Sequence, residues 1–294
     1  MSVPSVDLPR ELDGLHVLVL PGGTDPLDLA AAWFPDAAWA REPVSAGEAA
    51  ARSRPMTGAR FRGIAAEAAD PAPGLLRLDG STSLEGPVPG GPAGQVDLYA
   101  LVPAESHAPD LALAWMTAAA RRAGGSVVTA DRARVVVPDP GAAVDLTLWS
   151  AQPLSAQDAL PLVRPAMSGA RVGPTEVPQQ AADGLTFSVT ATFEYDGAIT
   201  VRTGRSAEVP AALLRLDWRA YGPWSYRVSW QPPEPEELHV EQPSQLHLIA
   251  RARVQPSVAR VAAALWRAVG GTVVDSGGFV VPPEELQDRA TARR

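Results

Sequence analysis

The chain has 294 residues, of which 46% are hydrophobic and 20% charged, and its formal net charge is −8. This composition is typical of a globular protein, and the acidic balance argues against general affinity for nucleic acid or anionic lipid. Cysteine and lysine are both absent, which excludes disulfides, thiol nucleophiles, iron–sulfur clusters, Schiff-base lysines and Walker-type lysines. The N-terminus has no apolar signal core and no window approaches about 18 consecutive apolar residues, so we expect a cytoplasmic protein without membrane contact.

The first half of the chain opens with "LHVLVLPGGTDPLDLAAAW" (15–33), which predicts a strand, a short loop and a helix. A Gly-Gly pair between a strand and a helix can cradle a phosphate. Here Asp25 is better explained as the helix N-cap, and no lysine is available to contact a phosphate. Strands are predicted at 75–79 ("LLRLD") and 96–102, whereas the Gly- and Pro-rich stretches 49–74 and 80–95 predict loops.

A helix, a Gly-Gly pair and two Val-rich strands are then predicted over 109–138, and the same pattern returns at 256–282. Proline opens each of these two helices, where its missing N–H is tolerated. Further matching segments are 144–162 with 15–33, 213–217 (again "LLRLD") with 75–79, and 246–252 with 96–102. The four ordered matches indicate that the chain is written twice.

We therefore predict an α+β fold made by tandem duplication of a split βαβ, ferredoxin-like unit of βαββαβ type, with the two units paired about a pseudo-two-fold axis. The first repeat spans 1–140 and is loop-rich, the second spans 141–283, and 284–294 is a flexible polar tail. The second repeat alone carries an extra β-meander, beginning with a hairpin in which Gly197 takes the left-handed position and Phe193 pairs with Ile199. A second hairpin is predicted to turn at 221–224. Because duplication lessens the need for a partner copy, a monomer is favoured.

An aromatic stripe is the strongest candidate for a binding site. Trp224, Tyr226 and Trp230 alternate with Ser225 and Arg227 along one predicted strand, and Trp218 can join them from the strand before. One interpretation is a stacking platform for a ligand or a partner. The alternative is that these side chains pack in the core, which is the commoner fate of aromatic residues on one strand face.

Four residues are candidates for acid–base chemistry: His16, His247, Asp97 and Asp145. Each follows the first residue of a predicted strand, a position that also fits a solvent-facing rim. The sequence contains neither His-x-His nor His-Glu-x-x-His, so no metal site is expected, and no motif points to a cofactor.

The block "FEYDGAITV", the segment "VPAALLRLDW" and the helix–Gly-Gly–Val-Val pattern resemble a family of bacterial two-repeat α+β proteins to which no function is assigned. The likeness covers mainly residues 185–282 and implies a fold but no site residue. The function expected from the residues is that of a non-enzymatic protein that binds another protein or a small molecule. The alternative is an enzyme that uses histidine and carboxylate groups meeting between the two repeats.

Overall fold

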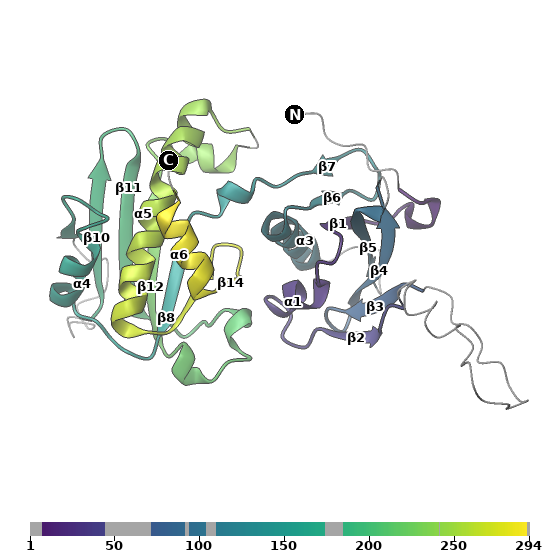
Figure 1. Cartoon of the computed structure of the whole chain (residues 1–294), viewed down its shortest axis with the longest axis horizontal. Helices are drawn as coiled ribbons and strands as arrows, with labels where there is room; N and C mark the ends of the chain where they lie inside the picture. The colour runs from purple at the N-terminus through teal and green to yellow at the C-terminus, as the bar shows by residue number, and fades with distance from the viewer. Residues whose placement is uncertain are drawn as a thin grey trace, which may run out of the picture. The chain divides into compact units, whose positions relative to one another are not determined.

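Figure 1 presents a computed structural model that describes residues 8–44, 72–91, 94–103, 110–173, 185–240 and 242–292. The chain divides into two compact units, Met1–Pro140 (unit 1) and Gly141–Arg294 (unit 2). Each unit has one seven-stranded sheet in which all neighbouring strands are antiparallel. The described residues also contain five α-helices, so the fold is α+β.

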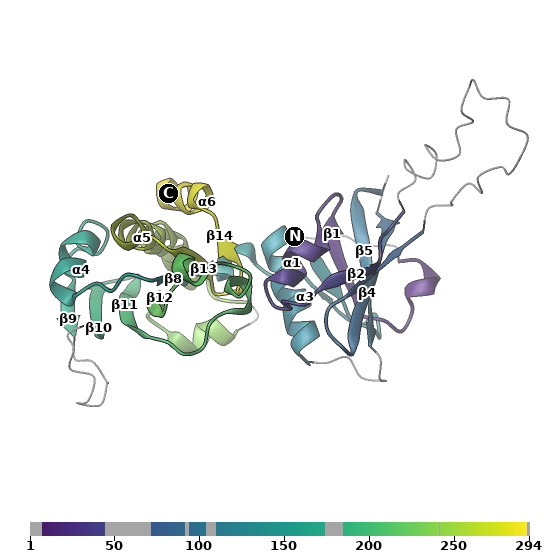
Figure 2. The ribbon, with the colours of Figure 1, turned by 90° about the horizontal axis from the view of Figure 1, so that it is seen from below.

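Unit 1 begins with a 3₁₀ turn and then alternates helices with the strands of its sheet. Its elements are η1 (Arg10–Leu12), β1 (Val17–Pro21), α1 (Pro26–Ala31), β2 (Ala38–Arg41), β3 (Gly74–Arg77), β4 (Thr82–Gly90), β5 (Val96–Pro103), α3 (Asp110–Ala123), β6 (Ser126–Val128) and β7 (Val135–Val136). The strand order is β2-β3-β4-β5-β1-β6-β7. Helices α1 and α3 contact each other and lie on one side of this sheet (Figure 2).

Unit 2 is built in the same manner, with one further helix at its end. Its elements are η3 (Pro140–Ala142), β8 (Leu146–Ser150), α4 (Ala156–Val163), β9 (Arg171–Gly173), β10 (Phe187–Phe193), β11 (Gly197–Arg205), η5 (Ala211–Leu213), η6 (Trp218–Ala220), β12 (Trp224–Gln231), η7 (Pro235–His239), α5 (Gln245–Val269), β13 (Thr272–Asp275), β14 (Val280–Val281) and α6 (Pro283–Thr291). The strand order is β14-β13-β8-β12-β11-β10-β9. Helices α4 and α5 cover one side of the sheet, and α6 packs on α5 (Figure 2).

The two units share one order of α-helices and strands along the chain: a strand, a helix, four strands, a helix and two strands. The strands also take corresponding places in the sheets, since β1 lies between β5 and β6 while β8 lies between β12 and β13. The prediction of a meander confined to the second half is therefore wrong. Strands β3, β4 and β5 form the corresponding run in unit 1, and residues 82–90, predicted as part of a loop, are β4.

A Gly-Gly pair ends the long helix of each unit. Gly124 and Gly270 have φ of +73° and +64°, the left-handed conformation that lets the chain leave the helix. The following glycines lie against the first strand of each sheet. A Cβ on Gly125 would come within 2.1 Å of the Val19 carbonyl oxygen, and one on Gly271 within 2.0 Å of that of Trp149. Both residues of each pair are thus required, one for conformation and one for close approach.

Two segments that were predicted as strands have a different structure. Residues 213–217 leave η5 through turns, whereas the identical pentapeptide at 75–79 begins in β3. Residues 246–252 form the first turns of α5, which begins after the N-cap Ser244 and contains Pro256 in its interior. The hairpin predicted to turn at 221–224 is therefore absent. β12 instead pairs with β11 and β8.

The first hairpin of unit 2 forms as predicted, but with another register. Gly197 has φ +81° and pairs with Phe193, and Ala191 pairs with Ile199. The register predicted for Phe193 is thus wrong by two residues. Because a shift of two preserves the alternation, the same side chains still face the core.

The prediction of a flexible polar tail over 284–294 is wrong as far as Thr291. Residues Pro283–Thr291 form α6, whose Leu286 and Ala290 are buried in the core of unit 2. These two residues are four positions apart, so they lie on one face of the helix and pack together against α5. The polar residues occupy the remaining face.

Candidate functional site

Three members of the predicted aromatic stripe lie in the core of unit 2. Trp224, Tyr226 and Trp230 are buried in the cluster that includes residues of α4 and α5. Two of them have internal hydrogen bonds: the Tyr226 hydroxyl donates to the Gln152 carbonyl at 2.7 Å, and the Trp230 indole N–H donates to the Asp196 carbonyl at 2.7 Å. Burial raises the pKa of Tyr226 to about 12. Because at most 5% of each side chain is exposed, these three residues fit the alternative of core packing and not a stacking platform.

Trp218 is separated from that stripe and is exposed. It lies in η6, and its side chain retains 57% of its accessible surface, while Leu214 and Leu216 retain 55% and 40%. We call these three residues the apolar ledge. They extend from the connection between β11 and β12, which is where the sequence led us to expect a strand.

The connection that carries the ledge is anchored to the sheet. Leu213 is fully buried against Trp149 and Val274 on the side of the sheet opposite α5. The Asp217 carboxylate accepts the Arg219 N–H at 2.9 Å, and the Thr272 hydroxyl donates to the Ala220 carbonyl at 2.8 Å. Leu213 before the ledge and Ala220 after it are therefore both attached to the sheet. This attachment limits the conformational entropy that the ledge loses when a partner covers it.

Below the ledge, Trp149 has an unusual environment. Its indole nitrogen is buried and has no hydrogen-bond partner in the described part of the chain. Such a group costs about 1–3 kcal/mol. The side chain contributes apolar surface to the small cluster under Leu213, so its role is to support the ledge from within the sheet.

The acid–base candidates of unit 1 do not meet. His16 directly precedes β1, whereas Asp97 pairs with Leu20 near the other end of that strand. One oxygen of the Asp97 carboxylate accepts the Gly23 N–H at 3.0 Å. Asp25 accepts the Leu27 N–H at 2.8 Å, which confirms it as the N-cap of α1. The N–H groups of Gly22 and Thr24 donate to backbone carbonyls, so the amide groups of this loop that could have contacted a phosphate have internal partners.

The acid–base candidates of unit 2 both contact Trp230. His247 is buried near the start of α5 and not at a strand rim, and its ring lies 5.0 Å from that of Trp230. The Asp145 carboxylate accepts the backbone N–H of Trp230 at 2.9 Å and lies 3.9 Å from the Arg227 guanidinium. Burial raises the pKa of Asp145, and the Trp230 hydrogen bond and the Arg227 charge oppose this rise. Both side chains hold the core tryptophan in place.

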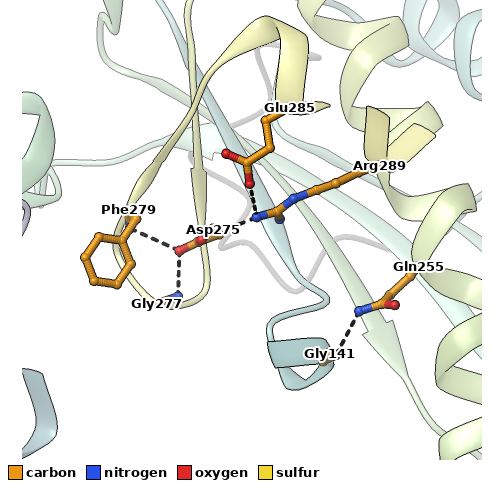
Figure 3. A network of polar contacts seen from close by, with 7 residues as sticks. All are labelled: Gly141, Gln255, Asp275, Gly277, Phe279, Glu285 and Arg289. Atoms are coloured by element: carbon orange, nitrogen blue, oxygen red, sulfur yellow. Dashed lines mark hydrogen bonds and ion pairs between the residues drawn. The ribbon is translucent and has the colours of Figure 1, made fainter. Parts of the chain in front are cut away.

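A third cluster joins α6 to the turn between β13 and β14 (Figure 3). Asp275 is buried, and its Oδ1 accepts the N–H groups of Gly277 at 2.9 Å and Phe279 at 3.0 Å. Its other oxygen lies 3.8 Å from Arg289, which contacts Glu285 at 2.5 Å. Nearby, the Gln255 amide donates to the Gly141 carbonyl at 2.8 Å. These contacts are all internal, so the cluster stabilises the fold.

The sheet of unit 2 has a polar face on the side away from α4 and α5, which the sequence analysis missed. The register places the following residues there: Thr147, Arg171, Ser188, Thr190, Thr200, Arg202, Arg227 and Ser229. We call this set the polar face. Arg202 and Arg227 are directly opposite each other on β11 and β12, and both are exposed. The Thr190 and Thr200 hydroxyls are hydrogen bonded at 3.1 Å.

The described residues contain no group of three or more His, Asp or Glu side chains that could hold a metal ion. Within the same ranges, no helix has the length and apolar character needed to cross a membrane. Comparison of the chain with protein-family models, with curated proteins and with solved structures gives no match.

Proposed function

We propose that the protein is a non-enzymatic interaction protein of the cytoplasm, and that a protein partner docks on the apolar ledge of unit 2. The observation that carries this proposal is the exposure of Leu214, Leu216 and Trp218 within five residues of a connection that is anchored to the sheet. Large exposed apolar groups that lie together indicate an interaction site.

Tryptophan is the side chain expected to dominate such a site. At interfaces, a few residues supply most of the binding energy, and tryptophan is among the most enriched of them. Trp218 combines a large apolar surface with an indole N–H that can be satisfied by the partner. The two leucines would exclude water around it.

The enzyme alternative receives less support from the geometry. It needs histidine and carboxylate groups that converge, but His16 and Asp97 lie toward opposite ends of β1. The His247 ring packs on Trp230, and Asp145 is engaged by the Trp230 N–H and Arg227. The side chains of Asp97, Asp145 and His247 thus contact internal groups that hold the fold.

We further propose that the chain arose by tandem duplication of a split βαβ, ferredoxin-like unit, and that it acts as a monomer. The shared element order and strand order of the units support the duplication. In each unit, four central strands and two helices follow the βαββαβ order, as in β1-α1-β4-β5-α3-β6. The remaining strands extend the sheet at its edges.

Native mass spectrometry of the protein recovered gently from its own cytosol tests the proposed function. We expect a second polypeptide at fixed stoichiometry, and we expect Trp218→Ala to reduce its occupancy at least about tenfold, as for an interface hot spot. Tyr195→Ala removes an even more exposed aromatic side chain from the β10–β11 hairpin and is the matched control.

Two results would contradict this proposal. A small molecule that survives desalting would indicate a ligand pocket in place of a protein-docking surface. A second polypeptide that stays bound to the Trp218→Ala variant as tightly as to the wild type would place the interface elsewhere.

A further inference from the structure

The apolar ledge and the arginines of the polar face lie on the same side of the unit 2 sheet. One cross-strand row contains Ser188, Arg202, Arg227, Thr147 and Val274. The last of these, Val274, is covered by Leu213, the buried anchor of the ledge. A partner that covers the ledge can therefore extend directly over the arginines.

Arg202 and Arg227 are directly opposite each other on neighbouring strands, an arrangement that does not stabilise a sheet. Like charges directly opposite each other on neighbouring strands are destabilising. The carboxylate beside Arg227 is Asp145 at 3.9 Å, and Arg202 has no carboxylate partner among the residues that the structure describes. Arg171, exposed on β9, likewise has none within those ranges. An arrangement that opposes local stability is expected where function requires it.

The corresponding face of unit 1 is different in kind. There, Val17, Val19, Leu98 and Ala100 form an apolar surface that is buried beneath Leu12 of η1. The sheet face opposite the helices is therefore covered by apolar packing in unit 1. In unit 2 the corresponding face is polar and carries exposed arginines. The difference identifies unit 2 as the one with a sheet face available to a partner.

The chemistry of this face selects carboxylates. The planar guanidinium group forms paired hydrogen bonds with a carboxylate, and neighbouring hydroxyls such as those of Thr190 and Ser229 can complete its hydrogen bonding. Strands lie about 4.8 Å apart, so the two opposed arginines can contact one carboxylate together or two that are adjacent on a peptide.

A nucleic acid fits less well. Proteins that bind single strands on a sheet stack the bases on aromatic side chains. On the described strands, the aromatic residue of the polar side is Trp149, and Leu213 covers it. Trp218 of the ledge is exposed, but one indole can stack a single base and not a run of them. The net charge of −8 also opposes the approach of a long polyanion.

We propose that the partner presents an acidic peptide segment to Arg202, Arg227 and Arg171, with apolar side chains of the same segment on the ledge. This inference rests on the proposed function and adds the chemistry of the partner to it. The arginines provide charge complementarity and orientation, and the ledge provides apolar burial.

A fluorescein-labelled peptide of repeated Glu-Leu-Glu-Ser-Gly units is a suitable probe, with anisotropy measured on the full chain. We expect binding that weakens as salt rises from about 50 to 200 mM. The double variant Arg202→Gln/Arg227→Gln should weaken it at least about tenfold. The melting temperature should change little, because relief of the opposed charges offsets loss of the contact between Arg227 and Asp145.

The control Arg260→Gln/Arg267→Gln makes the same change in net charge on α5, on the other side of the sheet, and should leave binding unaltered. Equal binding by the two double variants would overturn the inference, as would a failure of the wild type to bind the probe. Preference for a single-stranded oligonucleotide would overturn it in favour of a nucleic acid. If Trp218→Ala abolishes capture of the natural partner while the arginine variants retain it, the acidic segment is wrong and the docking function stands.

Discussion

Replacing Trp230 with alanine is expected to lower the free energy of unfolding by about 3–5 kcal/mol, the range for truncating a large buried aromatic side chain. Only 4% of the Trp230 surface is exposed, and its ring contacts His247 at 5.0 Å. Truncation would leave a cavity between β12 and α5. It would also leave the Asp196 carbonyl without the indole N–H that it accepts at 2.7 Å.

Denaturant unfolding of the two variants Trp230→Ala and Trp218→Ala separates the core from the ledge. For Trp218→Ala we expect a change within about 0.5 kcal/mol, because surface substitutions seldom exceed this. Similar losses for the two variants would contradict the division of the aromatic residues into a buried stripe and an exposed ledge.

Replacing Asp275 with alanine is expected to cost about 3 kcal/mol, because a buried carboxylate that accepts two backbone N–H groups would be removed. Those N–H groups, from Gly277 and Phe279, shape the turn between β13 and β14. The change also leaves Arg289 with Glu285 alone, so the attachment of α6 is weakened.

The variant Asp275→Asn is the matched control, since its amide oxygen can still accept both turn N–H groups. We expect it to cost about 1–2 kcal/mol, the share that belongs to the charge opposite Arg289. Calorimetric melting of both variants provides the measurement. If alanine and asparagine are equally mild at this position, the cluster in Figure 3 does not anchor α6.

Several parts of the fold could be predicted because their signals are local. Asp25 as an N-cap, the Gly-Gly helix ends and the positive φ of Gly197 each depend on residues close in sequence. The pentapeptide at 75–79 and 213–217 shows the limit of such signals. The first copy extends beside β4, whereas the second follows Pro210 and buries Leu213 against Trp149, so the tertiary context decides.

The start of α5 was missed because residues 246–252 open with an apolar-polar-apolar run, like the strand 96–102 with which they were matched. The correct signal is the Ser244 cap, followed by the buried residues His247, Ala250, Val254 and Val258, whose spacing is helical.

Asp275 and Arg289 illustrate a different limit, since no local pattern relates a turn aspartate to an arginine on a later helix. The arginines of the polar face come from β9, β11 and β12, and only strand pairing brings them to one surface.

The central claim is that unit 2 binds a partner on the side of its sheet opposite α5. Amide hydrogen exchange tests this claim most directly, measured on the full chain with and without the acidic Glu-Leu-Glu-Ser-Gly peptide. We predict that the peptide slows exchange in β11, in β12 and in the connection that carries Leu214, Leu216 and Trp218, and leaves unit 1 and α6 unchanged. Protection confined to α5 or to unit 1, or no protection anywhere, would contradict the account.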